Sequence, residues 1–130
     1  MNNISIPATR KTPWVMFNQG NIVIKGRAIS ENPGELFRPL HDWVIQYAAG
    51  AFPRTEIILG FEYINTSSIK WIFAILKEFG ALKNSFAYIR VTWNYEAGDE
   101  DMAELGYFFK SFIDCPFSVV AVEKIIIPED

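Results

Sequence analysis

Hydrophobic residues along the chain follow two periods, one typical of strands and one typical of helices. Short apolar runs rich in β-branched and aromatic residues, with turn residues at their ends, predict strands. These runs occupy residues 14–17, 21–28, 56–64, 86–93 and 117–125. Between them, apolar side chains recur every three or four positions, which predicts amphipathic helices. The helical segments occupy residues 36–47, 67–79 and a stretch that begins near residue 99.

Each predicted helix carries one apolar stripe that should face a common core. The first stripe consists of Leu36, Phe37, Leu40, Trp43, Val44 and Tyr47. The other two consist of Ile69, Ile72, Phe73, Leu76 and Phe79, and of Met102, Leu105, Phe109 and Phe112. Pro39 predicts an irregular first turn or a kink in the first helix. Residues 1–12 show little periodicity and predict a loose N-terminal segment.

The elements occur in the order strand, strand, helix, strand, helix, strand, helix, strand. Strands joined through a helix pair in parallel, because a dozen or more residues must carry the chain back across the sheet. The first two strands, joined by Asn18-Gln19-Gly20, form an antiparallel hairpin instead. We therefore expect residues 1–130 to form a single α/β domain with a mixed sheet and helices packed on it.

Composition narrows the class of protein. Hydrophobic residues make up 50% of the 130 residues and charged residues 21%, which is typical of a globular domain. The net charge is −3 and no Lys/Arg run occurs, which argues against a nucleic-acid partner. We expect no signal peptide, and no apolar run reaches membrane-spanning length. A lone cysteine, Cys115, cannot form an internal disulfide, so we expect a reducing cytoplasm.

Four polar residues, Asn65-Thr66-Ser67-Ser68, stand where a strand meets a helix. In open α/β sheets, ligands and modifications gather at such junctions. Asn, Ser and Thr are also favoured helix N-caps, so the cluster has a purely structural interpretation. The other interpretation is phosphorylation, because a helix amino end favours negative charge through its free N–H groups and its dipole. A third is that the junction holds an anionic metabolite in a small enzyme or ligand-binding module.

Acidic residues gather at the predicted start of the third helix. They are Glu96, Asp99, Glu100, Asp101 and Glu104. Carboxylates complement the dipole there, and they would also suit docking of a basic partner surface. Neither the spacing nor a glycine pattern fits an EF-hand, so we expect no metal site.

The remaining candidates for chemistry or contact are isolated. Asp42 follows His41 on a helix and points about 100° away, so it cannot orient the ring for a catalytic triad. Cys115 has no predicted histidine neighbour and is interpreted as a packing residue. Among the aromatics, Tyr63 is interpreted as core, whereas Trp71 is as suited to a partner surface as to the core.

Several segments together resemble one family, the SiaC family of small bacterial regulatory phosphoproteins. They are Tyr63-Ile64 followed by residues 65–70, Thr12-Pro13, the first-helix region from Gly26 to Tyr47, residues 91–95, residues 98–106 and Cys115-Pro116-Phe117. The resemblance covers nearly the whole chain. Ser30 replaces the proline that usually precedes Glu31-Asn32, and Asn94 stands where an aromatic residue is common.

The resemblance implies an STAS-like fold, similar to that of anti-sigma-factor antagonists, and a signalling role without enzymatic activity or a cofactor. It implies that Thr66 is phosphorylated by a SiaB-like protein kinase and dephosphorylated by a SiaA-like PP2C-type phosphatase. The unphosphorylated form would bind and regulate a target such as a diguanylate cyclase. Ser68 is the alternative acceptor, because it aligns better with the phosphorylated serine of the antagonists.

The remaining residues of the two polar clusters are then expected to contact partners. These residues are Asn65, Ser67, Ser68, Trp71, Asp99, Glu100, Asp101 and Glu104.

Overall fold

The computed structural model describes residues 2–50, 52–80 and 88–128 of the chain, which form a single mixed α/β domain. The strands and helices follow one another as β1 (Ile4–Ile6), β2 (Trp14–Asn18), β3 (Asn21–Ala28), α1 (Pro33–Ala48), β4 (Arg54–Ile64), α2 (Thr66–Gly80), β5 (Tyr88–Glu96), α3 (Glu100–Phe112) and β6 (Phe117–Val122). This confirms the α/β class. The STAS likeness stays a prediction.

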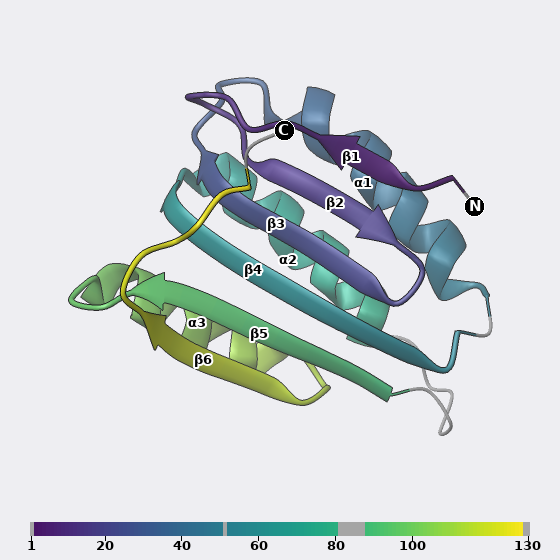
Figure 1. The fold of residues 1–130 in the computed structure, drawn as a ribbon. Helices are drawn as coiled ribbons and strands as arrows, with labels where there is room; N and C mark the ends of the chain where they lie inside the picture. The colour runs from purple at the N-terminus through teal and green to yellow at the C-terminus, as the bar shows by residue number, and fades with distance from the viewer. Residues whose placement is uncertain (1, 51, 81–87, 129–130) are drawn as a thin grey trace.

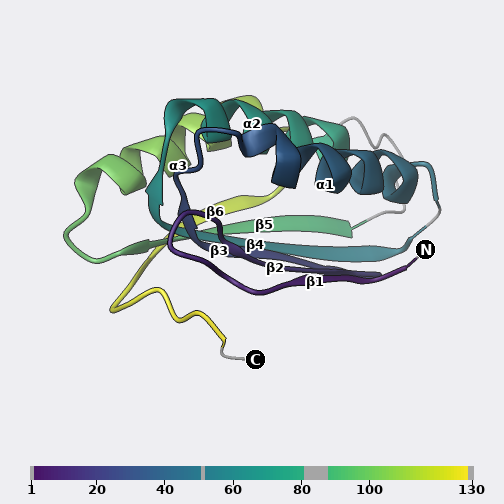
Figure 2. The same cartoon turned by 90° about the horizontal axis from the view of Figure 1, so that it is seen from above.

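The six strands lie in the sheet in the same order as in the sequence (Figure 1). β1, β2 and β3 pair antiparallel, and β3, β4, β5 and β6 pair parallel. Each parallel step passes through one helix, and such crossovers are right-handed. Because every step moves in the same direction across the sheet, all three helices cover one face of it (Figure 2).

The same topology gathers the three helix starts at one edge of the sheet. α1, α2 and α3 each begin within a few residues of the carboxyl end of a parallel strand. Parallel strands end at a common edge, so the start of α2 and the start of α3 lie along it together. Both polar clusters of the sequence are therefore placed at this edge.

The core lies between the helices and the sheet. Its largest fully buried side chains include Trp93, Tyr47, Phe17, Phe37, Phe61, Phe79 and Phe109. Tyr47 also carries a polar link, because its hydroxyl accepts from the N–H of Gly20 at 3.1 Å and lies 2.6 Å from that of Thr55. Most of the α1 stripe is buried as predicted, and α1 runs through Pro39 without interruption.

The C-terminal segment crosses the sheet face that the helices leave open (Figure 2). Ile125 is only 3% exposed, and its N–H donates to the Glu96 carboxylate at 2.9 Å. A Cβ on Gly60 would lie 3.1 Å from Ile125 Cδ1, so the glycine makes room for the segment. The predicted last strand ends earlier than expected, at Val122 rather than Ile125.

Two predictions were wrong, one about the N-terminal segment and one about the orientation of Phe112. Residues 1–12 are not all loose, because Ile4–Ile6 pairs with β2 and the carbonyl of Asn2 accepts a 2.7 Å bond from Trp43 Nε1. Phe112 does not face inward but is 50% exposed. The start of the strand predicted over residues 86–93 lies in part outside the described residues.

Gly106 gives a direct test of the packing of α3 on the sheet. A Cβ there would lie 2.5 Å from Cδ1 of Trp93, which is fully buried and donates its Nε1–H to the Met102 carbonyl. Gly106→Ala should lower the free energy of unfolding by about 1–2 kcal/mol, because overpacking outweighs the gain in helix propensity. Urea denaturation measures this. Gly80→Ala, whose Cβ would meet ordinary contact at 3.7 Å, should not destabilise the protein.

Candidate functional site

Asn65 caps the start of α2. Its Oδ1 accepts from the N–H of Ser68 at 2.9 Å, and its backbone carbonyl accepts from Ile69 at 3.0 Å. The cap also joins two parts of the chain, since Nδ2 donates to the Ser30 carbonyl at 2.9 Å and the Asn65 N–H donates to Ala28. The residue therefore fixes α2 to the loop that leads into α1, which confirms the structural interpretation for Asn65 itself.

The three hydroxyl residues that follow have different exposures. Thr66 and Ser67 are exposed, whereas Ser68 is completely buried. The Ser67 hydroxyl donates to Asn65 Oδ1 at 3.3 Å. The Ser68 hydroxyl finds no hydrogen-bond partner in the part of the chain that is described. An enzyme acting on the folded protein can thus reach Thr66, but neither an enzyme nor a docked partner can reach Ser68.

A signal for the burial of Ser68 was present in the sequence. Ser68, Ile72, Ile75 and Phe79 are spaced by four, three and four residues, which places them on one side of a helix. All four are buried, whereas Ile69 and Phe73, expected in the stripe, are only half-buried. The helix is therefore rotated slightly from its predicted orientation, and this rotation turns Ser68 inward.

The electrostatics at the start of α2 favour an added negative charge. The first turn contains no acidic side chain, and exposed Lys70 lies one turn beyond Thr66. A helix amino end carries about half a positive charge, and an anion followed four residues later by lysine is a favourable pair. A phosphoryl group on Thr66 would therefore be stabilised by α2 rather than unwind it.

The side chain of Trp71 projects from α2 toward α1 and is half-buried. Arg38 Cζ is 5.4 Å from its ring centroid, and the His41 ring is 6.2 Å away in an edge-on arrangement. His41 Nε2 lies 3.4 Å from a Glu78 carboxylate oxygen. Trp71 thus presents part of its ring about one turn beyond Ser67, on the same helix as Thr66.

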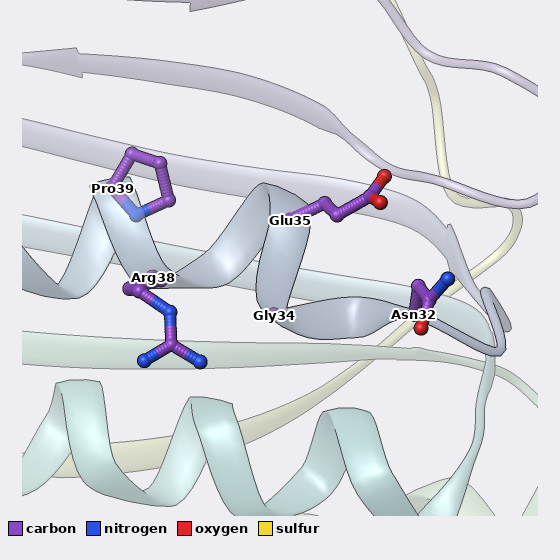
Figure 3. A pocket seen from close by; sticks show the side chains of 5 residues that line it. All are labelled: Asn32, Gly34, Glu35, Arg38 and Pro39. Carbon is purple, nitrogen blue, oxygen red and sulfur yellow. The ribbon is translucent and has the colours of Figure 1, made fainter.

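A cavity of about 410 Å³ opens at the start of α1 (Figure 3). It is lined by Asn32, Gly34, Glu35, Arg38 and Pro39. None of these residues belongs to the segment from 65 to 68, so this cavity does not support a metabolite held at the junction of β4 and α2.

The acidic run divides into structural and free carboxylates. Asp99 caps α3, accepting from the Met102 N–H at 3.2 Å, and Glu96 binds the C-terminal segment. Glu100, Asp101 and Glu104 are exposed on α3. Within residues 2–50, 52–80 and 88–128, no group of three His, Cys, Asp or Glu side chains could hold a metal ion.

Tyr63 was predicted to be core but is 61% exposed. The pairing of β3 with β4 shifts between Gly26 and Arg27, which leaves one extra residue in β4. A bulge of this kind turns the following side chain to the other face of the sheet. Tyr63 consequently lies beside Arg27, whose Cζ is 5.6 Å from the ring centroid.

Cys115 is half-buried. Burial raises the pKa of its thiol, and the charge of Asp114 raises it further. A raised pKa disfavours the thiolate, which is the reactive form. The interpretation of Cys115 as a packing residue therefore agrees with its surroundings.

Fold and site together define a mixed α/β domain that presents a capped helix start with an exposed threonine. The pattern that defines SiaC family regulatory phosphoproteins matches residues 6–122. The chain belongs to the SiaC family, and it is therefore a regulatory protein rather than an enzyme. None of the helices in the described ranges is long and apolar enough to cross a membrane.

Relatives from Pseudomonas aeruginosa agree with this assignment. An uncharacterized protein of strain UCBPP-PA14 is 31% identical over 126 residues, which is 95% of this chain and 100% of the relative. SiaC of Pseudomonas aeruginosa has a TM-score of 0.83 at 29% identity, with 94% and 100% of the two chains covered. A structure of the diguanylate cyclase SiaD in complex with its activator SiaC matches with a TM-score of 0.84 at 30% identity, covering 92% and 99%.

Replacing the cap tests its structural role. Asn65→Ala removes the bonds to the Ser68 N–H and to the Ser30 carbonyl, so the free energy of unfolding should fall by about 1–2 kcal/mol. Asn65→Asp keeps an acceptor for the Ser68 N–H and should lose less. Chemical denaturation compares the variants with Ser67→Ala, which should stay close to the parent. Equal stability of Asn65→Ala and the parent would show that the cap contributes nothing.

Proposed function

We propose that the protein is a signalling switch whose state is set by reversible phosphorylation of Thr66. A SiaB-like protein kinase would add the phosphoryl group, and a SiaA-like PP2C-type phosphatase would remove it. The unphosphorylated form would bind and regulate a target such as a diguanylate cyclase. The observation that carries the proposal is the exposed Thr66 side chain at the start of α2, beside a completely buried Ser68.

The scaffold is suited to a modification that leaves it intact. A phosphoryl group adds about −1.5 to −2 charges. The helix dipole and Lys70 favour these charges, while the cap at Asn65 is made by a different side chain. We therefore expect the phosphorylated and free forms to share one fold.

Target binding would be lost because the phosphoryl group has to be stripped of water. Burying a hydrated dianion in an interface is costly unless the partner supplies matching cations. A penalty of about 3 kcal/mol already weakens binding more than a hundredfold. Thr66, Ser67 and the exposed part of Trp71 lie within about two turns of α2, so a docked target would cover them together.

The relatives support the identity of the target class. SiaC of Pseudomonas aeruginosa forms a complex with the diguanylate cyclase SiaD, as its activator. We carry this to the present chain as a role in cyclic di-GMP signalling and biofilm regulation in the bacterial cytoplasm, where ATP is available to the kinase. The partners are proteins; neither nucleic acid nor a membrane is required.

Phosphorylation can be mapped with the kinase from the same genome and ATP. Intact-protein mass spectrometry should show one phosphoryl addition in the parent, in Ser67→Ala and in Ser68→Ala. Thr66→Ala should show none, because it lacks the proposed acceptor hydroxyl. The phosphatase should remove the addition. Modification that persists in Thr66→Ala but disappears in Ser68→Ala would mean that the acceptor was misassigned.

A charge mimic tests the mechanism of the switch. Thr66→Glu should weaken binding of the diguanylate cyclase of the same genome at least about tenfold, because even a single buried carboxylate is costly to desolvate. Its melting temperature should stay near that of the parent or rise slightly, since the carboxylate faces the helix dipole. Titration calorimetry and thermal melts measure the two quantities.

Thr66→Gln is the matched control, because it has similar size without charge and should retain most of the affinity. If Thr66→Glu bound the cyclase as tightly as the parent, charge at this position would not control docking. If it bound weakly but melted at a much lower temperature, the switch would act through unfolding instead.

A further inference from the structure

α3 exposes a stripe that changes from acidic to aromatic along its length. This α3 stripe consists of Glu100, Asp101, Glu104, Tyr107, Phe108 and Phe112. The three aromatic side chains are 55%, 50% and 50% exposed. α3 is the last of the three helices laid across the sheet, over β5 and β6, so no other helix of the described ranges covers its outer side (Figure 1).

The aromatic half of the stripe is an ordered apolar patch. The rings of Phe108 and Phe112 lie 5.0 Å apart, and the ring of Phe112 lies 6.0 Å from that of Phe73 on α2. The Phe112 carbonyl accepts a 3.0 Å bond from Lys77, which fixes the end of α3 against α2. Clustered exposed aromatic rings are typical of interfaces, where rigid rings provide much of the binding energy.

The acidic half adds negative charge that no ion pair among the described residues neutralises. Glu100, Asp101 and Glu104 take part in no ion pair recorded among the described residues. The cap of α3 is already made by Asp99. These carboxylates are thus free to pair with cations of a partner that lies along α3.

We propose that the α3 stripe docks an amphipathic helix of another protein, antiparallel to α3. The apolar first half of that helix would cover Phe108 and Phe112, and basic residues in its last turns would face Glu100, Asp101 and Glu104. Antiparallel packing fits because basic residues at a helix carboxyl end complement its dipole. The surface is on α3 and does not depend on Thr66.

A second copy of the chain fits the stripe less well. Two antiparallel copies of α3 would set the acidic half of each against the aromatic half of the other. Lys77 lies beside the aromatic half, 3.0 Å from the Phe112 carbonyl, but each copy carries a net charge of −3, so two copies repel each other. Charge complementarity therefore favours a basic partner.

The test uses a labelled peptide of about 18 residues, long enough to span α3. Leucines form one face in its first half, and three lysines occupy its last two turns. Fluorescence anisotropy should show saturable binding to the full chain. Phe108→Ala should weaken it about tenfold, as expected for a central aromatic contact. Glu104→Lys should weaken it about fivefold and reduce its dependence on salt.

Matched controls lie on α1. Ile45→Ala removes an apolar side chain that is 44% exposed, and Asp42→Lys makes the same charge change on an exposed position. Both should bind the peptide like the parent, as should Thr66→Glu. Because Phe108 also contacts Phe109, Tyr107→Ala serves as a second aromatic variant if Phe108→Ala proves unfolded by circular dichroism.

Three outcomes would overturn the proposal. One is that the parent does not bind the peptide, or that the aromatic and charge variants bind it as tightly as the parent. Another is equally tight binding of a peptide in which glutamates replace the lysines. The third is a dimer of the chain in sedimentation that Phe108→Ala converts to monomer, since the stripe would then be occupied by a second copy.

Discussion

The right-handedness of the crossovers is the constraint on which the rest of the structure depends. β3 to β6 are laid down in one direction, so every helix falls on the same face and starts at the same edge. One face of the sheet is thereby buried under helices, and the other is left to the C-terminal segment and to solvent (Figure 2). The functional edge is a consequence of this topology.

At that edge the protein separates stability from accessibility. Asn65 supplies the cap and the bond to the Ser30 carbonyl, and Ser68 fills a buried position. Thr66, between them, is exposed. A modification at Thr66 is thus local, because the side chains that hold α2 in place are not the one that would carry the phosphoryl group. A single residue that served as both cap and acceptor would link every modification to a loss of helix stability.

The sequence predicted what depends on period and on turn chemistry. The order of the elements after β1, the stripe of α1 and the presence of a helix cap within residues 65–68 all follow from such local rules. Ser68 and Phe112 were misplaced because a helix can rotate by a fraction of a turn while keeping its period. Tyr63 was misplaced because a bulge changes the face of a strand without changing its composition. The short strand at Ile4–Ile6 depends on pairing with β2, which no local pattern specifies.

The start of α2 and the α3 stripe differ in how a phosphoryl group on Thr66 affects them. α2 and α3 touch through aromatic side chains, since the ring centroids of Phe73 and Phe109 lie 6.0 Å apart. The outer side of α3 lies one crossover further along the sheet, and salt screens exposed charges beyond about 8 Å, so a charge on Thr66 acts weakly there. Its main effect falls on a partner that buries Thr66 itself, through desolvation. A partner on α3 alone would remain bound in both states, and so the same modification can release one protein while another stays attached.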